Sequence, residues 1–207
     1  MKLLSPSLLF LIPLLYIYSF QTPDKKGYEI GGVVSDFSLM NVNGKKVSMS
    51  DYKDAEGFIL VFTCNTCPCS QANENRLNKL NEKFSGSGYY VIAINSNDPE
   101  VSPKDSFEKM KLRAEKESFN YPYLDDGKQK ICAKYGALKT PEVFILKKEN
   151  NKLILRYRGV IDDNVLYEEK VKEHFVEDAV IALIKGEKLK KTTTKAHGCR
   201  IACKVLY

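Results

Sequence analysis

The sequence contains no tryptophan, only two histidines, and no second Cys-x-x-Cys motif beyond the one at Cys64 and Cys67. A structural zinc site uses four Cys or His ligands, and this chain offers no matching second pair to complete one. The sequence also has no internal repeat, which excludes architectures built from repeated units. What remains is a chain of 207 residues, long enough for one full-sized domain with its own core and short appendages.

Positive charge is concentrated near the C-terminus. The net charge is +6, and residues 185–204 carry seven lysines and arginines against one acid, Glu187. Basic segments can bind nucleic acid or anionic membranes, but here no aromatic residues are interleaved and no nucleic-acid-binding motif is present. We therefore expect residues 187–207 to form a solvated, flexible tail with no nucleic-acid partner, and residues 30–186 to form the folded domain.

The N-terminus has the pattern of a targeting segment. Lys2 provides a short positive region, and residues 3–20 are almost wholly apolar, with Pro6 and Pro13 interrupting them. This pattern predicts a secretory signal peptide over residues 1–21. Because the end of the segment lacks the usual small-x-small cleavage pattern, an uncleaved membrane anchor stays open as the alternative. Either reading predicts an exported protein, periplasmic or extracellular, in a compartment where disulfides persist.

Apolar runs and helical periodicity alternate along the rest of the chain. The predicted strands include residues 37–39, 47–49, 58–62, 89–94, 142–146 and 153–157, and the predicted helices run from the cysteine cluster to Gly86, from Pro103 through Ala114, over 127–135 and over 174–184. Asn43-Gly44 predicts a hairpin between the first two strands. Strands that alternate with helices and then close on an antiparallel hairpin predict an α/β sandwich with a mixed sheet.

The Cys-x-x-Cys pair lies where a buried strand is predicted to run into a helix. A helix N-terminus offers unpaired backbone N–H groups and a partial positive charge, and both favour the thiolate, which is the nucleophile. Cys64, the first of the pair, is the predicted attacking residue, and Cys67 is predicted to resolve the mixed disulfide. A structural disulfide or half of a zinc site would use the same pair, but the strand-to-helix junction favours redox chemistry.

Several segments together carry a family resemblance: residues 32–39, 62–68, 95–99 and 135–137, the pairs Thr140-Pro141, Asp162-Asp163 and Gly198-Cys199, and Tyr157-Arg158-Gly159. The chain resembles the thioredoxin superfamily over residues 31–186. Within it, the chain is similar to the redoxin group of alkyl hydroperoxide reductase and thiol-specific antioxidant proteins, in a peroxiredoxin-like subgroup with a thioredoxin-type Cys-x-x-Cys. The resemblance implies a thioredoxin-like three-layer sandwich, in which a mixed central sheet is flanked by helices.

The resemblance also implies a cis proline facing the cysteines. Pro141, after Thr140, fills that position and would shape a substrate groove by letting an extended partner backbone approach the sulfurs. The chain departs from typical thioredoxins, which have Trp-Cys-Gly-Pro-Cys. It also departs from typical peroxiredoxins, whose threonine three residues before the reactive cysteine is Val61 here if Cys64 is reactive. Because the peroxiredoxin threonine is absent, we expect disulfide exchange rather than peroxidase activity.

The remaining cysteines have open roles. Cys69, Cys199 and Cys203 are candidate auxiliary thiols. The i, i+4 spacing of Cys199 and Cys203 would place them on one helix face or let them pair, and Cys199 could instead swing to the active site as a resolving thiol. Cys132 has the setting of a small core residue. A buried acid near the pair would suit proton transfer, but the sequence does not single one out.

Three functions follow in order of preference. The first is an exported thiol-disulfide oxidoreductase that exchanges a Cys64–Cys67 disulfide with protein thiols or disulfides and needs no cofactor. The second is a peroxiredoxin-like thiol peroxidase acting on a small peroxide. The third is a non-enzymatic carrier of a soft metal bound by Cys64, Cys67 and Cys69.

Overall fold

The computed structural model describes residues 27–203, so the predicted signal peptide or anchor lies outside the described residues. The strands are β1 (Val33–Val34), β2 (Ser38–Asn41), β3 (Lys46–Ser48), β4 (Gly57–Thr63), β5 (Tyr89–Asn95), β6 (Tyr123–Asp125), β7 (Lys139–Thr140), β8 (Glu142–Glu149), β9 (Lys152–Gly159) and β10 (Cys199–Arg200). The α-helices are α1 (Pro68–Gln71), α2 (Glu74–Phe84), α3 (Phe107–Lys116), α4 (Lys130–Tyr135) and α5 (Phe175–Lys185). Short 3₁₀ turns cover Met49–Asp51, Ser85–Ser87, Pro103–Asp105 and Glu168–Lys170.

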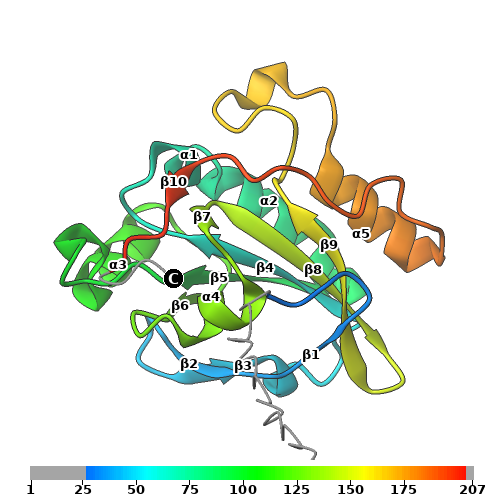
Figure 1. Cartoon of the computed structure of the whole chain (residues 1–207), viewed down its shortest axis with the longest axis horizontal. Coiled ribbons are helices and arrows are strands. Elements are labelled where there is room, and N and C mark those ends of the chain that lie inside the picture. Colours follow the sequence, from blue (N-terminus) through cyan, green and yellow to red (C-terminus); the bar gives the residue numbers. More distant parts are fainter. Residues whose placement is uncertain (1–26, 204–207) are drawn as a thin grey trace, which may run out of the picture.

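Eight strands form one mixed sheet in the order β1-β9-β8-β4-β5-β6-β2-β3 (Figure 1). The central strand β4 pairs in parallel with β5 and antiparallel with β8, and all of its residues are buried. A strand buried on both faces reads as a continuous apolar run, which is why residues 58–62 were recognisable from sequence. The expected mixed sheet is confirmed, and so are the hairpins β2–β3 and β8–β9.

Helices cover both faces of the sheet and produce three layers. Alternate residues of β4 point to opposite faces: Ile59 and Val61 pack with α2, α3 and α5, whereas Phe58, Leu60 and Phe62 pack with α4. Each face therefore has its own buried cluster. In the part of the chain that the structure describes, no helix is long and apolar enough to cross a membrane.

The helix predicted to follow the cysteines is interrupted. It divides into the short α1 and the longer α2, with Asn73 between them. The Asn73 amide donates to the carbonyl oxygens of Cys69 at 2.7 Å and Val165 at 2.8 Å. Asparagine side chains that bond to nearby backbone compete with helix continuation, and here the second bond also ties the break to a distant loop. The expectation of one uninterrupted helix was wrong.

The helix predicted from Pro103 begins four residues later. Pro103–Asp105 is a single 3₁₀ turn, and Ser106 is extended before α3 begins at Phe107. This interruption points the Asp105 carboxylate back toward the loop of the cysteine pair, where it accepts a hydrogen bond from the Asn65 backbone N–H at 2.6 Å. The departure from sequence expectation thus coincides with a contact to the candidate site.

The C-terminal segment packs against the domain. Residues 192–203 are exposed or half-buried, as expected of a solvated end, but the expectation that they are flexible was wrong. The Thr194 N–H donates to the carbonyl oxygen of Arg158 near the end of β9, the Arg158 N–H donates to the Thr192 carbonyl, and β10 pairs antiparallel with β7. Composition does not reveal this docking because backbone groups make most of the contacts. In Figure 1 the segment runs across the molecule from α5 to the vicinity of α1.

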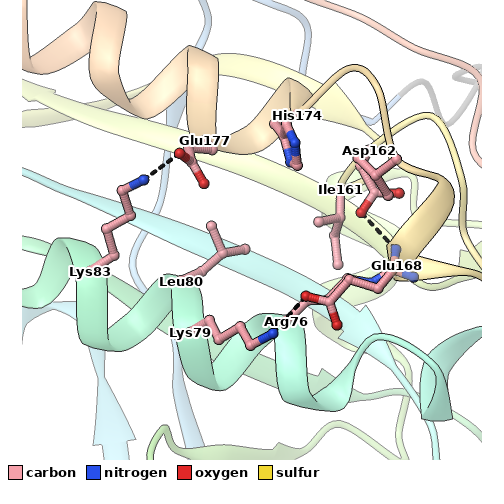
Figure 2. Close-up of a pocket in the computed structure, with 10 residues that line it drawn as sticks. Arg76, Lys79, Leu80, Lys83, Ile161, Asp162, Glu168, His174 and Glu177 are labelled. Atoms are coloured by element: carbon pink, nitrogen blue, oxygen red, sulfur yellow. Dashed lines mark hydrogen bonds and ion pairs between the residues drawn. The ribbon is translucent and has the colours of Figure 1, made fainter.

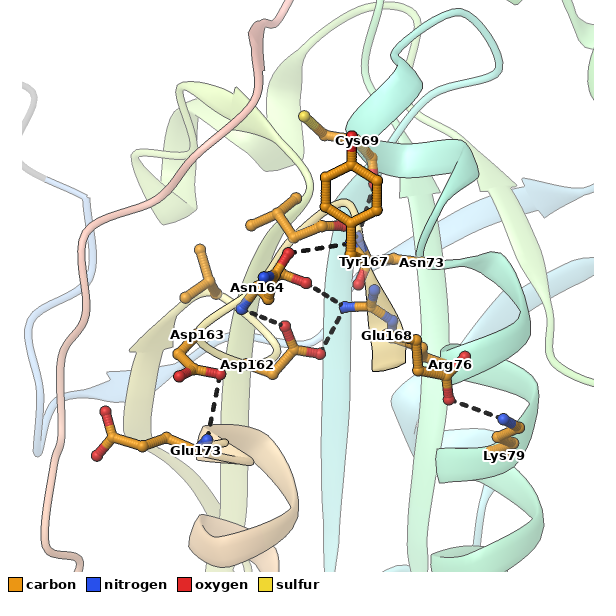
Figure 3. A network of polar contacts seen from close by, with 12 residues as sticks. Cys69, Asn73, Arg76, Lys79, Asp162, Asp163, Asn164, Tyr167, Glu168 and Glu173 are labelled. Carbon is orange, nitrogen blue, oxygen red and sulfur yellow. Dashed lines mark hydrogen bonds and ion pairs between the residues drawn. The ribbon is translucent and has the colours of Figure 1, made fainter. Parts of the chain in front are cut away.

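A buried ion pair joins α2 to the loop after β9. Arg76 donates through one terminal nitrogen to Asp162 at 2.6 Å and to the carbonyl oxygen of Asn164 at 2.8 Å (Figure 3). Both charged side chains are about 95% buried, with 5% and 4% exposed. The sequence assigned Asp162 only to a turn. The structure keeps the turn, through a bond from the Asn164 N–H, and adds the ion pair.

Candidate active site

Cys64 follows the last residue of β4, and Cys67 immediately precedes α1. The Cys64 side chain is 2% exposed and the Cys67 side chain 1% exposed. The peptide bond between Thr140 and Pro141 is cis, and both of these residues are buried beside the pair. The structure therefore brings together the four residues that the sequence selected for exchange chemistry, although β4 and Pro141 lie far apart along the chain.

Thr140 contacts both sulfurs. Its hydroxyl lies 3.3 Å from the Cys64 Sγ, and its carbonyl oxygen lies 3.1 Å from the Cys67 Sγ, to which it offers an acceptor when Cys67 carries a proton. A second hydroxyl, that of Thr66, lies 3.8 Å from the Cys64 Sγ. Thr140 thus holds the two sulfurs against a fixed backbone segment.

Hydrogen bonding shifts the pKa values of the two active-site thiols in opposite directions. All six cysteines are free in the structure. The Cys64 thiol donates a hydrogen bond to the Cys67 sulfur, which lowers the pKa of Cys67 and, together with burial, raises the pKa of Cys64. Hydrogen bonds from Cys199 and from the Ser70 backbone lower the pKa of Cys67 further. Since the helix begins after Cys67, the stabilising donors converge on the second cysteine of the motif.

A buried carboxylate organises the loop between the two cysteines. Asp105, 2% exposed, accepts hydrogen bonds from the Asn65 backbone at 2.6 Å and from the Thr66 hydroxyl at 2.8 Å. It also accepts from the Asn97 amide at 2.9 Å and the Ser102 hydroxyl at 2.6 Å. Its negative charge contributes to raising the pKa of Cys64. Sequence reasoning expected a buried acid near the pair but could not select this one.

The Asn65 side chain is fixed as well. Its amide donates to the Lys104 carbonyl at 2.9 Å, and its oxygen accepts from the Tyr123 hydroxyl at 3.0 Å. Tyr123 is buried in the sheet, and burial holds its pKa well above the ordinary value, so the hydroxyl stays protonated and remains a donor. No feature of the sequence linked Tyr123 or Asp105 to the cysteines, because each is separated from them by tens of residues.

The other cysteines are divided between the site and the core. Cys69 is half-buried, and burial together with the neighbouring Cys67 sulfur raises its pKa. Cys132 is buried in the core, as expected, and burial is the main cause that raises its pKa to about 12. Cys199 reaches the pair, and its backbone N–H donates to the Cys67 Sγ at 3.5 Å. Cys203 does not share a helix face with Cys199, since the chain around both is extended or irregular.

A metal site is not formed by the side chains described. Among residues 27–203, no group of three or more His, Cys, Asp or Glu residues is arranged to hold a metal ion. Cys64, Cys67 and Cys69 are close in sequence, but Cys67 Sγ is engaged with hydrogen-bond partners from Thr140 and Cys199. The geometry thus gives the metal-carrier alternative no support.

A pocket of about 140 Å³ lies elsewhere, between α2 and the segment leading into α5 (Figure 2). It is lined by charged residues that pair across it, Lys79 with Glu168 at 2.7 Å and Lys83 with Glu177. Its lining contains none of the cysteines. The cysteine pair is therefore not part of this pocket.

The family model described as "AhpC/TSA family" matches residues 30–167, more than half of the chain. The chain belongs to the AhpC/TSA family. This match covers β4, the cysteine pair and Pro141, and it confirms the redoxin resemblance. The C-terminal segment that contains Cys199 lies beyond the matched residues.

Relatives of this AhpC/TSA family member include named proteins and solved structures. Thiol-disulfide oxidoreductase ResA of Bacillus thuringiensis is 25% identical over 126 residues, covering 61% of this chain and 68% of that protein. Thioredoxin-like protein YneN of Bacillus subtilis is 30% identical over 147 residues, covering 70% and 76%. An uncharacterized conserved protein from Geobacillus kaustophilus superposes with a TM-score of 0.78 at 31% identity, covering 86% of this chain and 94% of that one. The thioredoxin-like fold is confirmed.

Proposed function

We propose that this AhpC/TSA family member is an exported thiol-disulfide oxidoreductase that exchanges a Cys64–Cys67 disulfide with the thiols or disulfides of partner proteins. The similarity to thiol-disulfide oxidoreductase ResA supports the reaction class. The observation that carries the residue assignment is that Thr140, the residue before the cis proline, contacts both sulfurs, with its hydroxyl 3.3 Å from the Cys64 Sγ and its carbonyl oxygen 3.1 Å from the Cys67 Sγ.

The reduced pair reacts with a partner disulfide in two exchanges. Cys64 attacks one sulfur of the partner disulfide while its proton passes to the Cys67 thiolate, which the lowered pKa of Cys67 makes available. One partner sulfur leaves as a thiolate, and a mixed disulfide joins Cys64 to the other. Cys67 then loses its proton to solvent and attacks the Cys64 Sγ. The Cys64–Cys67 disulfide forms, the second partner thiolate leaves, and the partner has gained two electrons.

Hydrogen bonds around Cys67 favour the second exchange. The donors from Ser70 and Cys199 that lower the Cys67 pKa keep it a thiolate after the proton leaves. Thr140 and Asp105 act as positioning residues, the first at the two sulfurs and the second at the loop between them. The reverse sequence oxidises a partner dithiol, and the redox potential of the pair sets which direction dominates.

The decisive experiment is redox equilibration of protein lacking residues 1–21 with glutathione buffers, followed by alkylation and mass measurement. We expect a reversible two-electron couple whose disulfide joins Cys64 to Cys67, and this disulfide should be absent from the peptide maps of both Cys64→Ser and Cys67→Ser. A potential near about −270 mV would make the protein a reductant and one near about −120 mV an oxidant. Absence of a reversible couple, with rapid peroxide consumption instead, would replace this proposal with a thiol peroxidase.

Export rests on the apolar segment of residues 3–20. The test is subcellular fractionation of the full chain and of a variant lacking residues 2–21, with the mature N-terminus read by mass spectrometry. The full chain is expected outside the cytosol or on the membrane, and the shortened chain is expected inside. Equal cytosolic retention of both would contradict export.

A further inference from the structure

The C-terminal segment makes ordered contacts with parts of the chain that are distant in sequence. The Arg158 N–H donates to the Thr192 carbonyl at 3.0 Å, the Ile201 N–H to the Leu138 carbonyl at 3.1 Å, and the Asp98 N–H to the Ala202 carbonyl at 2.8 Å. Between these anchors, β10 lies antiparallel to β7, next to α1 (Figure 1). The segment is held on both sides of the cysteine pair.

Cys199 lies directly opposite Thr140 in the β7–β10 register. Thr140 is the residue before the cis proline, and its carbonyl oxygen and hydroxyl contact the two active-site sulfurs. From this position the Cys199 backbone N–H donates to the Cys67 Sγ at 3.5 Å. The tail thus places a third cysteine next to the exchange pair.

Gly198 lets the tail come this close. Its φ is +142°, a conformation that L side chains rarely adopt, and a Cβ at this position would lie 2.0 Å from the Thr140 carbonyl oxygen. Any other residue would therefore push the strand away from Thr140. The residue immediately before Cys199 is the one whose lack of a side chain permits the contact.

Exposure differs sharply between the three thiols. The side chains of Cys64 and Cys67 are 2% and 1% exposed, whereas Cys199 is exposed. The tail therefore brings a cysteine that is open to solvent next to the buried pair.

On the basis of the proposed function, we propose that Cys199 is a third redox thiol, which exchanges with the Cys64–Cys67 disulfide by attack on the Cys67 sulfur while β10 lies along Thr140 as an internal substrate. The Cys199 thiolate forms a bond to the Cys67 Sγ, the Cys64–Cys67 bond breaks, and Cys64 leaves as a thiolate that takes a proton from solvent. One disulfide is broken and one is formed, so the step involves no net oxidation and needs no further reactant.

The redox state of the pair controls the reactivity of Cys199. In the reduced protein, the hydrogen bond to the Cys67 thiolate, burial and the negative charge of that thiolate raise the pKa of Cys199 to about 11 and keep it protonated. Oxidation of the pair consumes the Cys67 thiolate, so the hydrogen bond and the charge effect are lost together. Cys199 becomes a better nucleophile when the disulfide it attacks is present.

The test uses the Cys64→Ser variant, in which the competing Cys64–Cys67 bond cannot form. The reduced variant is treated with oxidised glutathione, quenched with acid, alkylated and mapped by non-reducing peptide mass spectrometry. We expect the Cys67–Cys199 disulfide as the main intramolecular product. Cys67 bonded to Cys69 or to glutathione, with Cys199 alkylated as a free thiol, would overturn the proposal.

Matched variants distinguish docking from chance collision. Gly198→Ala in the Cys64→Ser background keeps every other thiol but displaces the strand, so the Cys67–Cys199 yield should fall about tenfold or more, as expected for a clash of this size. Gly186→Ala is the control, because Gly186 also has positive φ but nothing lies within 4 Å of its added Cβ. An equal loss in both variants would refute the role of β10.

A further variant separates this proposal from the proposed function. Cys199→Ser retains Cys64 and Cys67, and its Cys64–Cys67 couple with glutathione should remain. If that couple forms but no Cys199 disulfide is found in Cys64→Ser, the third-thiol proposal is wrong and the oxidoreductase assignment stands. If neither disulfide forms, the oxidoreductase assignment itself fails.

Discussion

Hydrogen bonding from three separate parts of the chain lowers the pKa of Cys67. Cys64 precedes it, Ser70 follows it in α1, and Cys199 arrives from the C-terminal segment. Each donor stabilises the thiolate relative to the thiol and lowers the pKa of Cys67. The reactivity of this sulfur therefore depends on one residue that lies 132 positions away.

Replacing Cys199 by alanine should raise the Cys67 pKa. A hydrogen bond to a charged group contributes roughly 1.5 kcal/mol or more, which corresponds to about one pKa unit. The pH dependence of Cys67 alkylation in the reduced protein, followed by mass spectrometry, reports this pKa. Alkylation of the parent protein should reach its plateau at a pH well below that of an ordinary cysteine, and the alanine variant should need a higher pH. Cys199→Ser retains a hydroxyl donor, so identical profiles for the alanine and serine variants would contradict the expectation.

The Asp105 carboxylate accepts four hydrogen bonds. In Asp105→Asn an amide nitrogen replaces one carboxylate oxygen, and that nitrogen cannot accept the hydrogen bonds made to the oxygen it replaces. Asp105→Asn should therefore cost about 1–3 kcal/mol of unfolding free energy in urea. It should also lower the Cys64 pKa, because the carboxylate charge that helps to raise it is gone. Thiolate absorbance measured against pH follows this second effect. Ser102→Ala, which removes one donor and no charge, should leave the titration unchanged; a shift of equal size in both variants would rule out the charge effect.

The elements that position Cys64 and Cys67 differ in how well the sequence predicts them. Strand β4 was predictable because both of its faces are buried, and the Cys-x-x-Cys motif at its end identified the site locally. The Thr140-Pro141 pair was recognised by family resemblance. Asp105 was not, because its contact with Asn65 depends on the interruption between Pro103 and Phe107, which sequence periodicity presents as one helix.

The Arg76–Asp162 ion pair fixes helix α2 to the loop after β9. Loss of this ion pair should lower the free energy of unfolding. Asp162→Asn leaves a buried guanidinium without its counter-charge, and breaking such a pair costs about 3–5 kcal/mol. Adding Arg76→Met should recover much of this loss. The exposed pair Lys79–Glu168 provides the control, since Glu168→Gln should cost less than about 1 kcal/mol. Urea unfolding measures all three variants, and similar costs for Asp162→Asn and Glu168→Gln would contradict the importance of burial.

At the scale of the whole molecule, the C-terminal segment links β9 to the cysteine site. Its sequence is rich in lysine and threonine and predicts solvent exposure, so an approach of Cys199 to the site was only one of several open alternatives and the strand pairing was not predicted. What fixes it is close backbone approach at two glycines: Gly198 beside Thr140, and Gly159, where a Cβ would lie 2.0 Å from the Thr194 hydroxyl. Because glycine has no side chain, these close contacts produce no hydrophobic pattern in the sequence.

Thr194 anchors the C-terminal segment to β9, and loss of this anchor should also weaken the contact between Cys199 and Cys67. Its hydroxyl accepts from the Val160 N–H at 2.9 Å and lies 2.7 Å from the Tyr157 hydroxyl, which itself donates to the Val160 carbonyl. Thr194→Val keeps the shape but leaves that N–H unpaired, at a cost of about 1–3 kcal/mol. If the segment docks as a unit, this cost also loosens Cys199 from Cys67, and alkylation of the buried Cys67 should accelerate at neutral pH. Thr193→Val, at the exposed neighbouring position, should change neither unfolding nor alkylation. Reduced stability of Thr194→Val with unchanged alkylation of Cys67 would mean that the two ends of the segment dock independently.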